Sequence, residues 1–180
     1  MIRPLILASA SPQRRAILED AGIAFEVRPA DVEEESEGEP GAVAEANARR
    51  KAAAVPGPLV LGADTIVALD GAILGKPRDA AQAREYLGRL NGRTHEVVGG
   101  IALARDGAVV ATAVEVTHVT FHEWDGAALD RYVATAEWQG RAGGYAIQGA
   151  GGSLVAFVDG DYLNVVGLAV DRLRTLLARV

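Results

Sequence analysis

Residues 59–69 read Leu-Val-Leu-Gly-Ala-Asp-Thr-Ile-Val-Ala-Leu, an apolar run interrupted by a single acid, Asp64. This pattern predicts a strand that runs up to Asp64 and continues to Leu69. A carboxylate buried in such a strand is costly unless it is paired, protonated or bound to a metal. Gly62 and Ala63 leave room beside it for a ligand or another backbone. The alternative is an acid at a turn or bulge that caps nearby N–H groups, but the pattern favours a functional acid.

The segments on both sides of this strand alternate between strand and helix patterns. Asp70-Gly71 and Asp106-Gly107 are hairpin turn signals, and the acidic tract within residues 31–41 predicts a loop. Strands are predicted at residues 5–8, 25–27, 94–105, 109–121 and 154–158, and helices at residues 12–22, 42–55, 79–90, 126–134 and from about 169. This order predicts an α/β protein whose strands are buried on both faces.

Composition bounds the function. The 180 residues are 49% hydrophobic, which suits one domain over residues 1–180, or a compact body with a smaller lobe beside a central cleft. A net charge of −6 argues against a nucleic-acid partner. The absence of Cys excludes disulfides, thiolate nucleophiles and Cys-ligated zinc. No window approaches the ~20 apolar residues of a membrane helix, and the amino terminus has no signal-peptide pattern. We therefore expect a cytoplasmic protein without a membrane partner.

An anion site is one interpretation of residues 8–15, Ala-Ser-Ala-Ser-Pro-Gln-Arg-Arg. Ser11 and Pro12 are typical of a helix start, where backbone N–H groups and the helix dipole favour negative charge. Arg14 and Arg15 add donors that suit phosphate oxygens. The alternative is an ordinary capped helix with solvated arginines, and the segment alone favours it.

Other candidates are individually weak. Lys51 and Lys76 lack the spacing of a phosphate-binding P-loop, and either could be a surface cation. Residues 140–149 hold four glycines, which permit close approach to a ligand, and Gln148 could pair with a base edge. The acidic tract could help to hold Mg²⁺ or Mn²⁺, or be a solvated loop. His118 and His122 have no obvious third partner, so zinc is not expected.

Taken together and in order, these segments resemble the Maf family. The resemblance rests on Leu5-Ile-Leu-Ala-Ser-x-Ser-Pro-x-Arg, Gly62-Ala-Asp-Thr, Leu74-Gly-Lys-Pro, Gly92-Arg-Thr-His, Ala142-Gly-Gly-Tyr-Ala-Ile-Gln-Gly and Gly160-Asp-Tyr-x-x-Val-Val-Gly-Leu. It implies an α/β fold with a long mixed twisted sheet and flanking helices, similar to inosine triphosphate pyrophosphatases, and a homodimer. It also implies hydrolysis of a nucleoside triphosphate to the monophosphate and pyrophosphate with a divalent metal cation. The segment that ends at Gly149 resembles the subgroup acting on dTTP and UTP.

The resemblance also assigns roles by position. Asp64 matches the family's proposed proton acceptor, and Lys51 and Lys76 match polar residues of its phosphate site, so these three are the candidate catalytic residues. Asp64 and Glu33 are the candidate metal ligands. The candidate substrate-binding residues are Ser9, Ser11, Gln13, Arg14, Arg15, Thr65 and Gln148. At position 13 the family often has Arg, whereas this chain has Gln13, and the nearby Arg15 is a possible substitute. At position 169 the family often has Pro, whereas this chain has Ala169. Two alternatives remain: a pyrophosphatase acting on 7-methyl-GTP or on nonstandard nucleotides in general, and a nucleotide-binding regulator of septum formation.

Overall fold

The structure is a computed structural model that describes residues 5–180. The expectation about a signal peptide therefore lies partly outside the described residues. The strands are β1 (Leu5–Leu7), β2 (Phe25–Val27), β3 (Val60–Leu69), β4 (Ala72–Leu74), β5 (Thr94–Arg105), β6 (Ala108–Phe121) and β7 (Val155–Asp159). The helices are α1 (Pro12–Asp20), α2 (Pro40–Ala54), α3 (Ala80–Leu90), α4 (Gly126–Ala134), α5 (Tyr162–Val166) and α6 (Val170–Leu177), with 3₁₀ turns η1 (Ala142–Gly144) and η2 (Ala150–Leu154). None of these helices combines the length and apolarity needed to cross a membrane.

Within the described residues, the strands form one mixed sheet in the order β2-β1-β3-β5-β6-β7, with β4 added to β3. β1 runs parallel to β2 and β3, and the other neighbouring pairs are antiparallel. Asp106 and Gly107, which join β5 to β6, have φ values of 47° and 83°. A two-residue type I′ turn requires positive φ at both positions, and its twist matches the twist of the strands. The predicted mixed α/β fold is confirmed.

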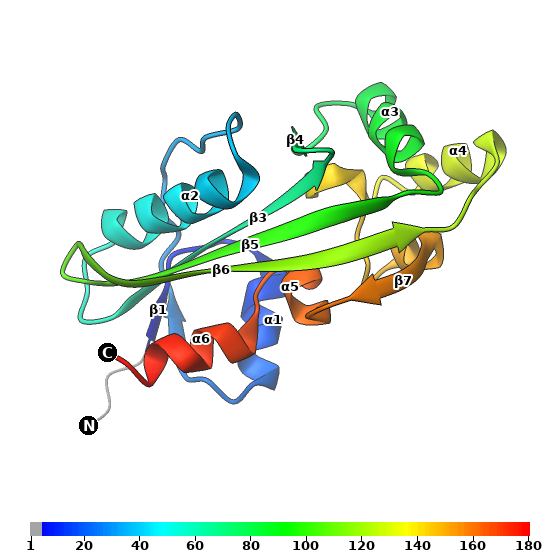
Figure 1. Cartoon of the computed structure of the whole chain (residues 1–180). Coiled ribbons are helices and arrows are strands. Elements are labelled where there is room, and N and C mark those ends of the chain that lie inside the picture. The colour runs from blue at the N-terminus through cyan, green and yellow to red at the C-terminus, as the bar shows by residue number, and fades with distance from the viewer. Residues whose placement is uncertain (1–4) are drawn as a thin grey trace.

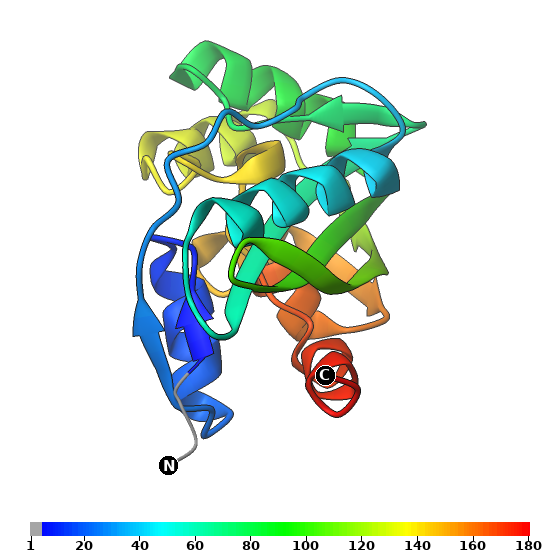
Figure 2. The ribbon, with the colours of Figure 1, turned by 90° about the vertical axis from the view of Figure 1, so that its left-hand side faces the viewer.

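Helices cover both faces of the sheet (Figures 1 and 2). The side chain of Leu61 points to the face covered by α1 and α6, where it packs with Leu18 and Leu173. Farther along the same face, Val67 belongs to a second core cluster with Leu87 of α3 and Leu129 of α4. α2 covers the opposite face. The two faces of β3 therefore have different neighbours, and Asp64 points to the α2 side.

The backbone of α2 comes close to the sheet at two glycines. A Cβ atom on Gly62 would lie 2.1 Å from the carbonyl oxygen of Ala48, and a Cβ on Gly100 would lie 2.1 Å from that of Ala44. Gly100 is the register partner of Asp64 on the neighbouring strand. The two glycines thus let the backbone of α2 approach the sheet beside Asp64, which brings the polar side chains of the helix within reach of that acid.

We expect Gly100→Ala to lower the free energy of unfolding by about 1–3 kcal/mol, the usual cost of overpacking. The new methyl group would collide with backbone atoms of α2, which cannot rotate away. Urea unfolding measures the change. Gly88→Ala is the matched control, because a Cβ there meets only the flexible end of Arg84 at 3.4 Å and Ala favours a helix more than Gly does. Equal stability of the two variants would contradict the close packing of α2.

The observed elements differ from the predicted ones in three places. α2 begins at Pro40 rather than at residue 42, because Glu39 accepts hydrogen bonds from the N–H groups of Gly41 and Ala42 and so caps the helix. The predicted hairpin turn at Asp70-Gly71 is present, and it joins β3 to a short strand, β4, whose bounds were not predicted. α5 was missed because a single turn is too short for a helical period.

Candidate active site

A cavity of about 490 Å³ lies beside β3, at a gap in the sheet. On this edge of β3, β1 pairs only with Val60 and Leu61, while β4 pairs with residues 67–69. Within the described part of the chain, residues 62–66 therefore pair with no strand on this side. Neighbouring side chains of a strand point to opposite faces, yet at this open edge both Asp64 and Thr65 line the same cavity. The volume is within the usual range for a small-ligand site.

Asp64 is buried and held by two side chains of α2. Its Oδ1 atom lies 2.9 Å from Nζ of Lys51, and its Oδ2 accepts a hydrogen bond of 2.9 Å from Nδ2 of Asn47. Asn47 and Lys51 are four residues apart and so lie on the same face of the helix. Burial of the carboxylate is tolerated here because it is both paired and hydrogen-bonded. Each oxygen keeps a further lone pair for a ligand in the cavity.

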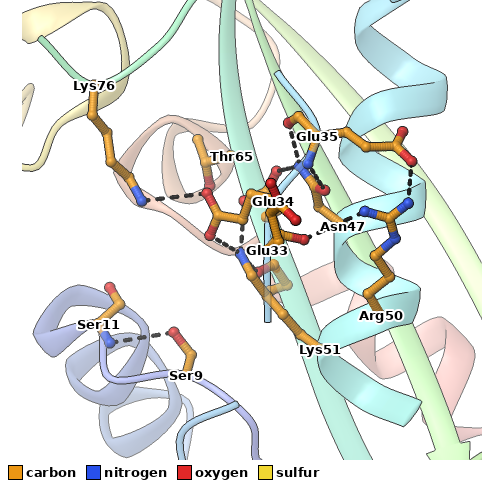
Figure 3. Close-up of polar contacts among 12 residues, drawn as sticks. Ser9, Ser11, Glu33, Glu34, Glu35, Asn47, Arg50, Lys51, Thr65 and Lys76 are labelled. Carbon is orange, nitrogen blue, oxygen red and sulfur yellow. Dashed lines mark hydrogen bonds and ion pairs between the residues drawn. The ribbon is translucent and has the colours of Figure 1, made fainter. Parts of the chain in front are cut away.

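Glu34 joins this group from the loop before α2. Its carboxylate lies 2.7 Å from Nζ of Lys51 and 3.5 Å from Nζ of Lys76. Figure 3 shows Lys76, Glu34 and Lys51 in one row of contacts. Burial alone would raise the pKa of Glu34, but the hydrogen bond and charge of Lys51, with the smaller effect of Lys76, outweigh it and hold the pKa below its ordinary value. The carboxylate is therefore a second fixed negative charge.

Arg14 organises the opposite side of the cavity. Ser11 caps α1 and Pro12 is its first residue, as predicted, which directs Arg14 inward from the first turn. Its guanidinium donates to Oγ of Ser9 at 3.0 Å, to Oγ1 of Thr65 at 3.1 Å and to the carbonyl of Gly167 at 3.0 Å. Burial lowers the pKa of Arg14, while the charges of Asp64 and, to a smaller extent, Glu34 raise it. The two hydroxyls are thus held at the cavity wall.

The glycine-rich segment is ordered by a clamp of Tyr132 and Glu137. The Glu137 carboxylate accepts hydrogen bonds of 2.9 Å from the N–H groups of Ala150 and Gly151 and from the Tyr132 hydroxyl. That hydroxyl accepts from the N–H of Ala146 at 3.1 Å. Gln148 lies between these anchors, lines the cavity, and is exposed. Its side chain makes no hydrogen bond with any described residue, so it is available to a ligand and does not brace the segment.

Tyr145 also lines the cavity, and its hydroxyl contacts a buried histidine. Nε2 of His95 lies 2.8 Å from this hydroxyl, and the two rings meet edge to face with Phe121. Burial lowers the pKa of His95 to about 4. The ring is therefore neutral near pH 7 and supports Tyr145 without adding charge to the cavity.

The cavity is cationic although the chain is acidic overall. Four cationic side chains line it (Arg14, Lys51, Lys76 and Arg141), together with two carboxylates (Asp64 and Glu34), so cations are in excess by two. The complete chain has a net charge of −6. A local excess of cations in a concave site favours an anionic ligand such as a triphosphate.

Most of the predicted site residues meet at this cavity. Those that line it are Ser9, Ser11, Gln13, Arg14, Lys51, Asp64, Thr65, Lys76 and Gln148. The structure does not bring Arg15 or Glu33 to it. Arg15 is exposed because it is rotated by about 100° around the helix from Arg14. Glu33 does not line the cavity, and its carbonyl accepts a hydrogen bond from Arg50 (Figure 3).

Sequence reasoning did not single out several residues that line or support the cavity, among them Glu34, Asn47, Arg141 and Tyr145. Nε of Arg141 is buried and has no partner in the described part of the chain. One signal was available for Asn47, which is a polar residue four positions before Lys51 in an Ala-rich helix. No local pattern separates Glu34 from its acidic neighbours.

Two carboxylates at the cavity suit a hard divalent cation only in part. Among the described residues, no group of three or more His, Cys, Asp and Glu side chains could hold a metal ion. Mg²⁺ commonly binds one or two carboxylates together with substrate phosphates and water. Asp64 and Glu34 fit that pattern if the substrate supplies the remaining oxygens.

Comparison with known proteins gives consistent matches along the chain. Residues 4–180 match the Maf-like protein family, Maf. Proteins named dTTP/UTP pyrophosphatase are similar to this chain: one from Anaeromyxobacter dehalogenans (strain 2CP-C) is 47% identical, covering 97% of this chain and 93% of its own length. One from Symbiobacterium thermophilum is 45% identical, covering 99% and 94%.

Among solved structures, a nucleoside-triphosphatase / dITP/XTP pyrophosphatase from Mycobacterium abscessus has a TM-score of 0.49 at 15% identity, covering 98% of this chain and 94% of that chain. Such a remote likeness says nothing about activity. The family match and the relatives at 45–47% identity cover nearly the whole sequence. These matches show that this chain belongs to the Maf family.

Proposed function

We propose that this protein is a nucleoside triphosphate pyrophosphatase that hydrolyses dTTP and UTP to the monophosphate and pyrophosphate. The observation that carries the proposal is a buried carboxylate, Asp64, held by a buried cation at the wall of a cationic cavity. The names of the relatives support the same reaction and the same two nucleotides. A nucleotide-binding regulator would need the cationic cavity but not this acid.

In the proposed reaction, water attacks the α-phosphorus in line and pyrophosphate leaves. Asp64 takes the proton of the water, because it is the buried carboxylate at the cavity wall and its two hydrogen bonds fix its orientation. Arg14, Lys51 and Lys76 offset the charge of the phosphates and of the leaving group. Most of the catalysis would then be electrostatic stabilisation and positioning.

We further propose that Mg²⁺ or Mn²⁺ takes part, held by Asp64 and by Glu34 in place of Glu33. Glu34 lines the cavity and Glu33 does not. Carboxylate and phosphate oxygens are the ligands that these hard ions prefer. When bound, such an ion would neutralise phosphate charge and make a water molecule more acidic.

We propose that Gln148, Gln13 and Thr65 select the base of the nucleotide. We expect Gln148→Glu to lower kcat/KM for dTTP and UTP by about 10-fold or more, and for purine triphosphates much less. An amide can pair with the oxygen and N–H that thymine and uracil share, whereas a carboxylate only accepts. Rates with dTTP, UTP, CTP, GTP and 7-methyl-GTP measure the change. Equal losses for all five would contradict the assignment, and a wild-type preference for 7-methyl-GTP would favour the alternative subgroup.

The decisive experiment identifies the first product. The wild-type protein is incubated with each triphosphate and Mg²⁺ or Mn²⁺, and phosphate is assayed with and without added inorganic pyrophosphatase. We expect a signal only when that enzyme is present, because pyrophosphate is the leaving group. Orthophosphate in its absence would mean that a different bond is cleaved, and no product with any nucleotide would favour the regulator.

The remaining expectations are a homodimer and a cytoplasmic location, which stay proposals. The family resemblance supports both. Light scattering coupled to size-exclusion chromatography tests the first, and a molar mass close to that of a single 18.7 kDa chain would contradict it.

A further inference from the structure

Asn47 is a buried amide that uses its donors and its acceptor together. Its Nδ2 donates to Oδ2 of Asp64 and to the carbonyl of Glu35, both at 2.9 Å, and its Oδ1 accepts from the N–H of Glu35 at 2.7 Å. The side chain is 2% exposed. The orientation of the amide follows from its partners, because the reversed amide would place its oxygen against two acceptors.

The two bonds to Glu35 anchor the loop that carries Glu34. They fix both backbone groups of the residue directly after Glu34, in the way that a strand partner would (Figure 3). With this backbone fixed, the carboxylate of Glu34 reaches Lys51 and Lys76, whereas Glu33 does not line the cavity. The third bond of Asn47 ends on the carboxylate of Asp64. One side chain therefore contacts both the acid of the strand and the segment that presents the acid of the loop.

We propose that Asn47 is a positioning residue that holds Asp64 and the segment of Glu34 in register with each other. This inference rests on the proposed function. Lys51, one turn later on α2, contacts both acids through its charge, whereas the neutral amide of Asn47 links Asp64 to the backbone of Glu35, the residue after Glu34. Because Gly62 and Gly100 seat α2 directly on the sheet, both bridges share one rigid support.

The residue type at position 47 matters for a chemical reason. A carboxylate there would face Oδ2 of Asp64 and the carbonyl of Glu35 with a negative oxygen, and an aliphatic side chain would leave all three partners without their bond. An amide is the neutral group that supplies both the donors and the acceptor. Loss of these bonds would let Asp64 rotate, and small displacements of catalytic groups cost large factors in rate.

The test compares Asn47→Leu and Asn47→Asp with the control Arg50→Ala in the full-length protein. Arg50 also tethers this loop, through the carbonyl of Glu33 and the carboxylate of Glu35, but it is exposed and makes no contact with Asp64. Steady-state kinetics with dTTP gives kcat and KM separately. Amide hydrogen exchange of Glu35 reports the hydrogen bonds between Asn47 and Glu35 independently of activity.

For Asn47→Leu we expect kcat to fall by roughly 10- to 100-fold, the range for losing a partner that orients a functional ligand, while KM changes by less than about threefold. Exchange at Glu35 should accelerate by about 10-fold or more, since its acceptor is gone. Asn47→Asp keeps an acceptor for that N–H, so exchange should stay close to wild type while kcat falls at least as far. It also serves if the Leu variant does not fold. Arg50→Ala should keep the wild-type kcat.

Wild-type kcat in Asn47→Leu and Asn47→Asp would overturn the positioning role while leaving the proposed function intact. An equal loss in Arg50→Ala would also overturn it, because tethering of the loop alone would then explain the effect. A wild-type protein without pyrophosphatase activity would instead refute the proposed function. The exchange rates would still show whether the hydrogen bonds between Asn47 and Glu35 exist.

Discussion

We expect Asp64→Asn to lower kcat for dTTP by at least about 100-fold, the usual scale for the loss of a general base. The substitution preserves shape and removes the group that accepts the proton. Lys51 keeps Glu34 as an ion-pair partner. The new amide can accept from either Lys51 or Asn47 but not from both, so stability should fall modestly. Initial rates of pyrophosphate release at saturating dTTP give kcat, and circular dichroism checks the fold.

Asp70→Asn is the matched control, because it makes the same chemical change in the turn directly after β3. Asp70 is exposed, pairs with Arg93, and has a φ of 52°, a conformation that Asn tolerates. Its activity should equal that of wild type. If Asp64→Asn instead keeps the wild-type rate in a folded protein, Asp64 is not the proton acceptor of the reaction.

The second large effect is expected from Lys51→Met, which should lower the free energy of unfolding by about 3 kcal/mol and abolish most activity. Nζ of Lys51 contacts Asp64, Glu34 and the carbonyl of Ala63. Removal of one partner of a buried ion pair leaves an uncompensated buried charge, and this costs more than the pair itself contributes. Methionine keeps most of the volume, so the loss is mainly electrostatic. Urea unfolding at pH 7 measures it.

The same variant should show a change in the pH dependence of stability. The pKa of Glu34 is lowered in the folded state, so this group stabilises the fold above its unfolded pKa, and that contribution disappears as pH falls through the folded pKa. Lys51 is a main cause of the lowering. The stability difference between wild type and Lys51→Met should therefore shrink toward acid pH.

Lys76→Met serves as the control for this pair of measurements. Lys76 lies 3.5 Å from the same Glu34 but its side chain is 57% exposed, and solvent-exposed ion pairs contribute little. We expect its free energy of unfolding to stay within about 0.5 kcal/mol of wild type, although turnover should fall. A loss as large as that of Lys51→Met would show that burial does not distinguish the two lysines.

Local chemistry in the sequence was enough to predict most of the fold. The Asp-Gly pairs predicted turns because Asp and Gly tolerate positive φ, and both turns are present. Ser11 followed by Pro12 predicted the start of α1 for a similar local reason. Asp64 stood out because an acid inside an apolar strand needs a compensating partner. Each of these inferences involves residues that are close together in the chain, where a short pattern carries the relevant energy.

Only the tertiary structure decided which neighbours of those residues reach the cavity. Arg14 rather than Arg15 enters it because packing of α1 fixes the rotation of that helix about its axis. Glu34 rather than Glu33 enters it because Asn47, 12 residues after Glu35, fixes the backbone of the loop. Asp64 and Thr65 share one cavity because β1 and β4 leave the edge of β3 open between them. These outcomes depend on contacts between segments far apart in sequence, whose geometry no local pattern contains.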